Sequence, residues 1–154
     1  MAAYFFDSSA LVKRYVAEKG TAWVIQLAAA ATGNRIYVAA ITAVEVSAAL
    51  TRRARGGSLS ASDAALSLAD FHNDLRGQYR ITDIAPALIA EAVNIAIKHG
   101  LRGYDAVQIA AALQVRAERL ALGASAPALI SADTELNAAA FAEGLAVENP
   151  NNHP

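Results

Sequence analysis

The sequence predicts an α/β fold built on a mostly parallel sheet, and three observations support this prediction. Short apolar runs rich in β-branched and aromatic residues alternate along the chain with longer segments of helical pattern. Most segments between the runs are long, which favours right-handed crossovers between parallel strands. Of the 154 residues, 55% are hydrophobic and 18% charged, which is enough to bury one full core. We therefore expect one domain at 1–148 and a flexible tail at 149–154.

The first half of the chain is expected to hold two strands and four helices. Ser8 or Ser9 can cap the first helix, and Gly33 can end the second. The pair Gly56-Gly57 stops the third. The expected elements are a strand at 3–6, helices at 10–17 and 21–31, a strand at 35–39, and helices at 42–54 and 60–75.

The second half repeats the alternation. Pro86 suits the first turn of a helix, and Gly100, Gly123 and Gly144 follow the ends of three helical patterns. The expected elements are a strand at 79–82, helices at 86–99 and 103–122, a strand at 129–131, a helix at 135–143 and a last strand at 146–148.

Composition excludes several classes of protein. The formal net charge of −1 gives no overall attraction to nucleic acid, so any such binding needs a local basic patch. The chain has no cysteine, which rules out disulfides, thiolate metal sites and a cysteine nucleophile. No two histidines have ligand spacing, and there is no P-loop, Gly-x-Ser-x-Gly or dinucleotide glycine motif. With no targeting segment and no apolar membrane span, we expect a cytoplasmic protein with no membrane contact.

Four acidic residues lie where an apolar run gives way to the start of a helix: Asp7, Glu45, Asp105 and Asp133. In an open parallel sheet, ligands bind in the crevice outside the carboxyl ends of the strands. Carboxylates gathered there would repel one another unless a proton or a cation lay between them. Magnesium and manganese are suited to such all-oxygen sites. The joint placement therefore predicts a metal-dependent phosphoryl-transfer enzyme.

Each acid also has a purely structural explanation. Asp7 and Asp133 can cap the helices that follow them. Thr42 to Glu45 fits a capping box, which for this match taken alone is the better explanation. Asp105 can start its helix after a turn. The functional prediction therefore depends on whether the four acids converge.

Four basic residues follow or precede the acids along the chain, and we expect them to bind RNA: Lys13, Arg14, Arg52 and Arg102. A basic rim around an acidic pocket would hold a nucleic-acid backbone while the pocket acts on one phosphate. For any single basic group, an ordinary solvated helix face is the simpler explanation.

Four motifs in order resemble the PIN domain family, and in particular the VapC-type toxins of toxin–antitoxin pairs. The resemblance runs over nearly the whole chain. It rests on Phe6–Lys13, Ile41–Val46, Leu101–Ala106, and Leu129–Asp133 with the downstream Gly144-Leu145. The family implies a three-layer α/β/α sandwich and a ribonuclease dependent on Mg²⁺ or Mn²⁺, leaving 3′-hydroxyl and 5′-phosphate ends.

The resemblance also implies roles for particular residues. Asp7, Glu45, Asp105 and Asp133 match the family's acidic quartet, which holds the metal and is catalytic. Ser9 matches the small hydroxyl residue that orients the first aspartate. Ser131 stands where the family often has threonine, and the hydroxyl is kept.

Such toxins imply an RNA substrate, a homodimer and a cognate antitoxin protein that covers the active-site groove. Apolar residues on the early helices are candidates for these contacts, with core packing as the alternative. The candidates are Leu11, Val12, Tyr15, Val16, Val46 and Leu50.

Two other functions are compatible with the sequence. One is a non-catalytic PIN-like module that binds RNA or protein and uses its acids only as helix caps. The other is an aspartate-dependent phosphatase or phosphoacceptor using Asp7, although Asp-x-Asp is absent there and no late lysine is obviously placed.

Overall fold

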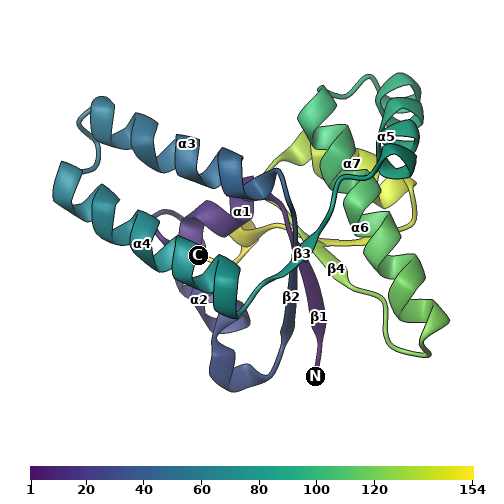
Figure 1. Cartoon of the computed structure of the whole chain (residues 1–154), viewed down its shortest axis with the longest axis horizontal. Helices are drawn as coiled ribbons and strands as arrows, with labels where there is room; N and C mark the ends of the chain where they lie inside the picture. Colours follow the sequence, from purple (N-terminus) through teal and green to yellow (C-terminus); the bar gives the residue numbers. More distant parts are fainter.

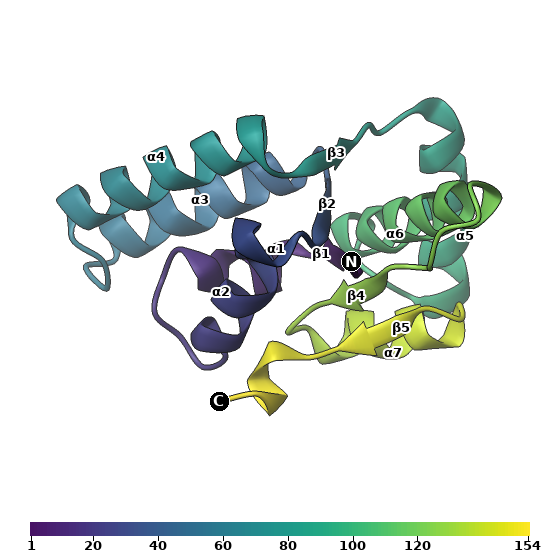
Figure 2. The same ribbon diagram turned by 90° about the horizontal axis from the view of Figure 1, so that it is seen from below.

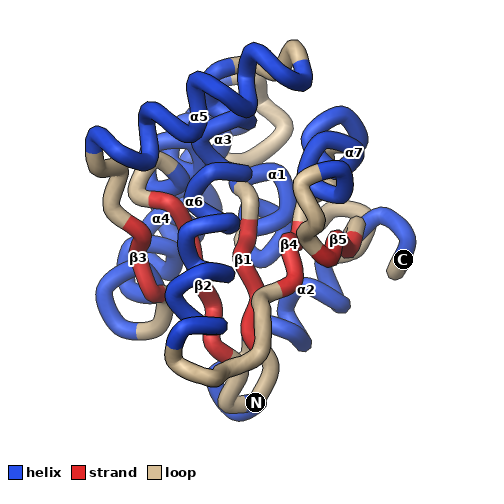
Figure 3. Tube along the Cα trace, turned by 90° about the vertical axis from the view of Figure 1, so that its right-hand side faces the viewer, coloured by secondary structure: helices blue, strands red, loops and turns tan.

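Five short strands form one sheet in which all neighbouring strands are parallel. The computed structural model describes residues 1–154, and the sheet order is β3-β2-β1-β4-β5 (Figure 3). The mostly parallel sheet predicted from the sequence is therefore confirmed. The strands are β1 (Ala3–Phe6), β2 (Arg35–Ala39), β3 (Arg80–Thr82), β4 (Ala128–Ile130) and β5 (Ala146–Glu148).

Helices cover both faces of the sheet. Helices α1 to α4 lie on one side and α5 to α7 on the other, which confirms the three-layer sandwich (Figures 1 and 2). The α-helices are α1 (Ser8–Leu11), α2 (Thr21–Ala28), α3 (Thr42–Arg55), α4 (Ala61–Gly77), α5 (Pro86–His99), α6 (Gly103–Ala121) and α7 (Thr134–Ala142). Short 3-10 turns η1 (Val12–Arg14), η2 (Ala30–Thr32) and η3 (Pro150–Asn152) complete the chain. A helix long and apolar enough to cross a bilayer is not among them.

The strands divide their side chains between two cores. Phe5 and Leu129 pack with α5, α6 and α7, whereas the next residues, Phe6 and Ile130, pack with α1 to α4. Alternate residues of a strand point to opposite faces, so each strand residue is committed to one layer. Both faces are covered at the centre of the sheet, which explains why β1 and β4 read as continuous apolar runs, whereas the edge strands β3 and β5 contain charged residues.

The strand order reverses beside β1. From β1 the chain moves outward through β2 to β3, then returns to the other side of β1 for β4 and β5. Asp7 follows β1, and its backbone N–H donates to the carbonyl of Ile130 at the end of β4 (3.0 Å). Such a switch point opens a crevice at the carboxyl ends of the strands.

The first helix is shorter than the sequence predicts. Instead of one helix at 10–17, the structure has α1 followed by the 3-10 turn η1. The chain leaves the helix at Tyr15 because that residue is held by α4. Its hydroxyl donates to Asp74 (2.7 Å), and its carbonyl accepts from Ser67 (2.9 Å).

Most of the apolar residues proposed for partner contacts belong to the core instead. Leu11, Val46 and Leu50 are fully buried and Val12 nearly so, all in the cluster between the sheet and α1 to α4. Tyr15 and Val16 are half-buried against the same cluster. Core packing, the alternative named above, accounts for these residues, because the inner faces of α1 and α3 meet the sheet.

The last six residues, expected to form a flexible tail, are placed against the body of the protein. Asn149 caps η3 by accepting from the N–H of Asn151 (2.9 Å), and Pro150 is buried. The His153 ring stacks on Trp23 with 4.1 Å between centroids. The local composition of residues 149–154 predicts a flexible segment. Its contact with α2 involves a residue far away in the sequence and is not visible in that composition.

A candidate metal centre at the sheet edge

Asp7 is held at the end of β1 by two serines. Only 3% of the residue is exposed. Its Oδ2 accepts from the Ser9 N–H (3.2 Å), the Ser9 hydroxyl (2.5 Å) and the Ser131 hydroxyl (3.3 Å). Its Oδ1 accepts no hydrogen bond from the protein. One oxygen therefore fixes the carboxylate and the other is left for a ligand.

The two serines also fix the loop after β4. The Ser9 hydroxyl accepts from the N–H of Ala132 (3.0 Å), and the Ser131 hydroxyl accepts from the N–H of Asp133 (3.1 Å). Ser131 is completely buried. The same hydroxyls that orient Asp7 thus position the start of α7, and with it Asp133.

Glu45 faces the centre and does not form a capping box. The residue before α3, Ile41, makes no side-chain cap, and Thr42 instead accepts from Gln108 (3.0 Å). Glu45 accepts from Gln108 Nε2 at Oε1 (2.8 Å) and from the Ser8 hydroxyl at Oε2 (3.2 Å). The structural explanation that the sequence favoured for Glu45 is therefore wrong.

Asp133 and Asp105 differ in how they are held. Asp133 caps α7, with Oδ1 accepting from the N–H groups of Glu135 (2.9 Å) and Leu136 (3.0 Å). Asp105 lies in the first turn of α6 and accepts no hydrogen bond, because the cap position is taken by Arg102. Asp133 thus keeps one oxygen without a hydrogen bond and Asp105 keeps two.

Electrostatics show that the four acids share one environment. Burial raises the pKa of Asp7. Burial, and then the charges of Asp7 and Asp105, raise the pKa of Glu45. The pKa of Asp105 rises to about 6 through burial and the charges of Asp133 and Asp7, against the opposing effect of Arg102. All six ion pairs of the protein involve other carboxylates, so none of the four acids is in an ion pair.

The chemistry of the donor atoms at this centre suits a hard divalent cation. As the side chains stand, no three acidic or histidine groups are arranged to hold one ion in common. Mutual repulsion between carboxylates without a cation favours such spreading. The donors are all oxygens, three of the acids have oxygens without a protein hydrogen bond, and Mg²⁺ often keeps several waters. Asp7, Glu45, Asp105 and Asp133 are the residues that could hold the ion.

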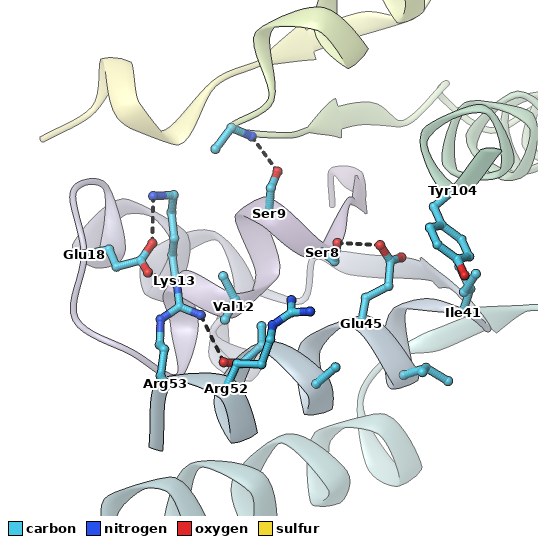
Figure 4. A pocket seen from close by; sticks show the side chains of 14 residues that line it. Ser8, Ser9, Val12, Lys13, Glu18, Ile41, Glu45, Arg52, Arg53 and Tyr104 are labelled. Atoms are coloured by element: carbon cyan, nitrogen blue, oxygen red, sulfur yellow. Dashed lines mark hydrogen bonds and ion pairs between the residues drawn. The ribbon is translucent and has the colours of Figure 1, made fainter. Parts of the chain in front are cut away.

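A groove of about 800 Å³ begins at this centre (Figure 4). Ser8, Ser9 and Glu45 line one end, and Tyr104 stands beside them. Val12, Ile41, Val44, Ala48 and Ala49 supply an apolar wall. At the other end lie Lys13, Glu18 and Arg53, and the Arg52 side chain lies between the two ends (Figure 4).

The predicted RNA-binding residues have different surroundings. Lys13 is buried, and its Nζ lies 3.2 Å from Glu18. Arg14 faces another depression, where it contacts Asp74 (3.4 Å). Arg52 lines the groove, and both it and Arg102 are exposed and form no ion pair. The structure thus separates two free arginines from two engaged basic residues.

Gln108, Glu18, Arg53 and Tyr104 contribute to the centre or the groove but were not singled out from the sequence. Gln108 follows Asp105 by one helical turn, so both can lie on one face of α6. This spacing from Asp105 is the feature of the sequence that could have identified Gln108 as part of the centre. Nothing local to Glu18 shows that it meets Arg53, 35 residues later.

Comparison with known proteins agrees with this architecture. The PIN domain family model matches residues 4–142. No curated protein sequence matches the chain. Among solved structures, PAE2754 from Pyrobaculum aerophilum is similar with a TM-score of 0.65 and 19% identity, covering 99% of this chain and 86% of that one.

Two further structures have the same fold. VapBC2 from Rickettsia felis, solved bound to a DNA fragment from its promoter, matches with a TM-score of 0.61 and 16% identity over 96% of this chain and 98% of that one. FitAcB from Neisseria gonorrhoeae matches with a TM-score of 0.60 and 19% identity over 96% and 97%. Because the family model spans most of the chain, the protein belongs to the PIN domain family.

Proposed function

We propose that the protein is an endoribonuclease dependent on Mg²⁺ or Mn²⁺, and the toxin of a toxin–antitoxin pair. The observation that carries this proposal is the group of four carboxylates without basic partners at the switch point of the sheet. Membership of the PIN domain family, whose members are generally nucleases, supports it.

The roles of the four acids follow from their surroundings. Asp7 offers Oδ1 while Ser9 and Ser131 hold Oδ2, and Glu45 is oriented from both sides by Ser8 and Gln108. A divalent cation bound by these carboxylates would lower the pKa of a water molecule and stabilise the charge of a scissile phosphate. The protein's own contribution is to orient the carboxylates of Asp7 and Glu45 with uncharged donors, while burial raises the pKa of both groups and so favours a cation beside them.

The groove supplies a path for the RNA. Arg52 is the proposed backbone contact within it, because its guanidinium forms no ion pair that RNA would have to displace. Arg102, exposed beside Asp105, is the second. Lys13 is a weaker candidate because Glu18 neutralises it, and Arg14 is weaker still because it faces another depression.

We also propose the partners that the resemblance to VapC-type toxins implies. These are an RNA substrate, a second copy of the chain and a cognate antitoxin, all in the cytoplasm. The apolar wall of the groove, which includes the exposed Val44, would suit a segment of the antitoxin lying over the acids. The similar folds of VapBC2 and FitAcB are consistent with this proposal.

A non-catalytic PIN-like binding module is the second candidate. Two observations favour it: Asp7 and Asp133 both cap helices, and no three acids are arranged to hold an ion. Such a module should bind Mn²⁺ negligibly, whereas the nuclease should bind it through the carboxylates.

The deciding experiment uses purified protein freed of any antitoxin. A panel of structured RNAs is incubated with and without Mg²⁺ or Mn²⁺, beside Asp7→Asn. Metal-dependent cleavage that the substitution abolishes is the expected result. Absence of both cleavage and Mn²⁺ binding would instead favour the binding module.

A further inference from the structure

Gln108 is a completely buried amide that joins two helices at the metal centre. Its Nε2 donates to Glu45 Oε1 (2.8 Å) and to Thr42 Oγ1 (3.0 Å). Its Oε1 is buried and has no hydrogen-bond partner. The residue thus uses its donors on α3 and leaves its acceptor unsatisfied.

The orientation of this amide follows from the chemistry of its neighbours. An ionised carboxylate can only accept hydrogen bonds, so Glu45 requires the NH₂ group and turns Oε1 away from itself. An unpartnered buried acceptor destabilises a fold, and an apolar side chain of similar size would avoid that penalty. Packing alone therefore does not explain a glutamine here.

We propose that Gln108 is a positioning residue that holds the Glu45 carboxylate for the divalent cation. This inference rests on the proposed function. Helix α6 would then serve the centre twice, directly through Asp105 and, one turn later, through Gln108 acting on Glu45. A hydrogen-bonded second layer of this kind orients metal ligands and raises their affinity for the metal.

The other oxygen of Glu45 supports the same inference. Oε2 accepts from the Ser8 hydroxyl (3.2 Å), and Ser8 follows Asp7 directly in the chain. Glu45 is thus tied to the neighbourhoods of Asp7 and Asp105 by two uncharged donors. Such donors fix direction without neutralising the charge that a cation would need.

Gln108→Met tests the inference because it keeps the length of the side chain and removes its donors. The matched control is Gln114→Met on the same helix, since Gln114 also donates to a glutamate, Glu118 (2.9 Å), away from the centre. Mn²⁺ affinity is measured by calorimetry at pH 7.5. We expect Gln108→Met to weaken binding about 10- to 100-fold and the control to leave it within about twofold.

Two further measurements separate positioning from a general structural role. The melting temperature of metal-free Gln108→Met should stay within about 4 °C of wild type or exceed it, because the unpartnered acceptor is removed. In a Glu45→Gln background, adding Gln108→Met should cause no further loss of Mn²⁺ affinity, since the two residues act through one carboxylate.

The outcomes are distinguishable. If wild type binds Mn²⁺ and Gln108→Met binds it equally well, or the two losses add, the positioning role is overturned. If wild type binds no Mn²⁺, the proposed function fails, and the inference fails with it. Should Gln108→Met not fold, Thr42→Val removes the second acceptor of the amide. We expect a smaller loss of affinity there, absent in the Glu45→Gln background, and an unchanged affinity would overturn the inference.

Discussion

The carboxylates at the two ends of the groove differ in whether a basic side chain is paired with them. At one end Glu18 is shared by two cations, Lys13 and Arg53, so the local charge is more than balanced. Glu45 lines the other end, and neither Glu45 nor the three acids grouped with it, Asp7, Asp105 and Asp133, has an ion pair. The charge of Glu18 is therefore neutralised within the protein. The charges of the four acids are not, and a bound cation would neutralise them.

The donors at the two ends explain this difference. Hydroxyls and an amide hold Asp7 and Glu45, which orients their oxygens without cancelling their charge. Charged partners hold Glu18, which stabilises the fold but leaves no reason for a metal to bind. An acidic residue lining the same groove is therefore a ligand candidate only where its partners are neutral.

The sharpest test of this comparison sets Asp7→Asn against Glu18→Gln. We expect Asp7→Asn to lower metal-dependent RNA cleavage by at least about 100-fold, because it removes a carboxylate proposed to bind the metal. Glu18→Gln should keep cleavage within about threefold, since only its structural ion pairs are lost. Initial cleavage rates in Mg²⁺ measure both. Equal losses in the two variants would break the comparison.

The ion pairs of Glu18 should contribute to the stability of the fold. Glu18→Gln leaves the buried Lys13 without its partner, and we expect about 1–2 kcal/mol lower free energy of unfolding, between the values for exposed and buried ion pairs. Urea denaturation of the metal-free protein measures the change. Glu91→Gln, at an exposed glutamate with no ion pair, is the control and should change stability little. A wild-type stability for Glu18→Gln would show that its ion pairs contribute nothing.

Mn²⁺ should stabilise the folded protein by binding to the four acids and not to Glu18. At a free Mn²⁺ concentration of about ten times Kd, binding adds about 1.4 kcal/mol, or about 4 °C in Tm for a protein of this size. Thermal melts with and without Mn²⁺ measure this shift, and EDTA should reverse it. The shift should persist in Glu18→Gln and disappear in Asp7→Asn. Its survival in Asp7→Asn would place the ion elsewhere.

The stability of the metal-free protein should depend on pH because the carboxylate of Asp105 lies among other acids without an ion pair. The pKa of Asp105 in the folded protein is about 6, above its usual value of 3.8. The folded state therefore binds more protons than the unfolded state between about pH 4 and 6, and stability falls as pH rises through that range. Asp105→Asn should lessen this fall and raise the metal-free Tm at pH 7.5 by about 2 °C. Melts from about pH 4 to 8 test this, and parallel curves for the two proteins would contradict it.

The smallest expected effect concerns the free arginine between the two ends. Arg52→Ala should weaken RNA binding about fivefold at 0.1 M salt and lower the slope of log affinity against log salt by about 0.7. Arg14→Ala is the control, because Arg14 faces a different depression. Fluorescence anisotropy with a labelled RNA in EDTA measures both variants. An unchanged slope for Arg52→Ala would exclude a phosphate contact.

The sequence predicted most of the fold because its patterns are local. Strand Arg35–Ala39 and helix Pro86–His99 lie where periodicity, a starting proline and a terminal glycine placed them. The first helix was predicted too long, since its end at Tyr15 depends on contacts with α4, 52 and 59 residues later. Local propensity does not contain such contacts.

The proximity of the four acids could be expected from the sequence, whereas their hydrogen-bond partners could not. The positions of the four acids at strand ends implied that they converge, and their mutual effects on pKa are consistent with this. The capping-box pattern at Thr42 to Glu45 was misleading because Gln108, 63 residues later, engages both residues. The hydrogen bonds of Thr42 and Glu45 are therefore set by a residue on α6, which the local pattern in α3 does not contain.

The stack of His153 on Trp23 turns the end of the chain into an optical probe. Trp23 is the sole tryptophan of the protein, so its emission reports on one place, where the last residues rest on α2. Gly20 lies under the same segment, with no room for a side chain beside the Pro150 carbonyl. Under native conditions, a fluorescence measurement without an added dye can therefore follow whether residues 149–154 rest on α2.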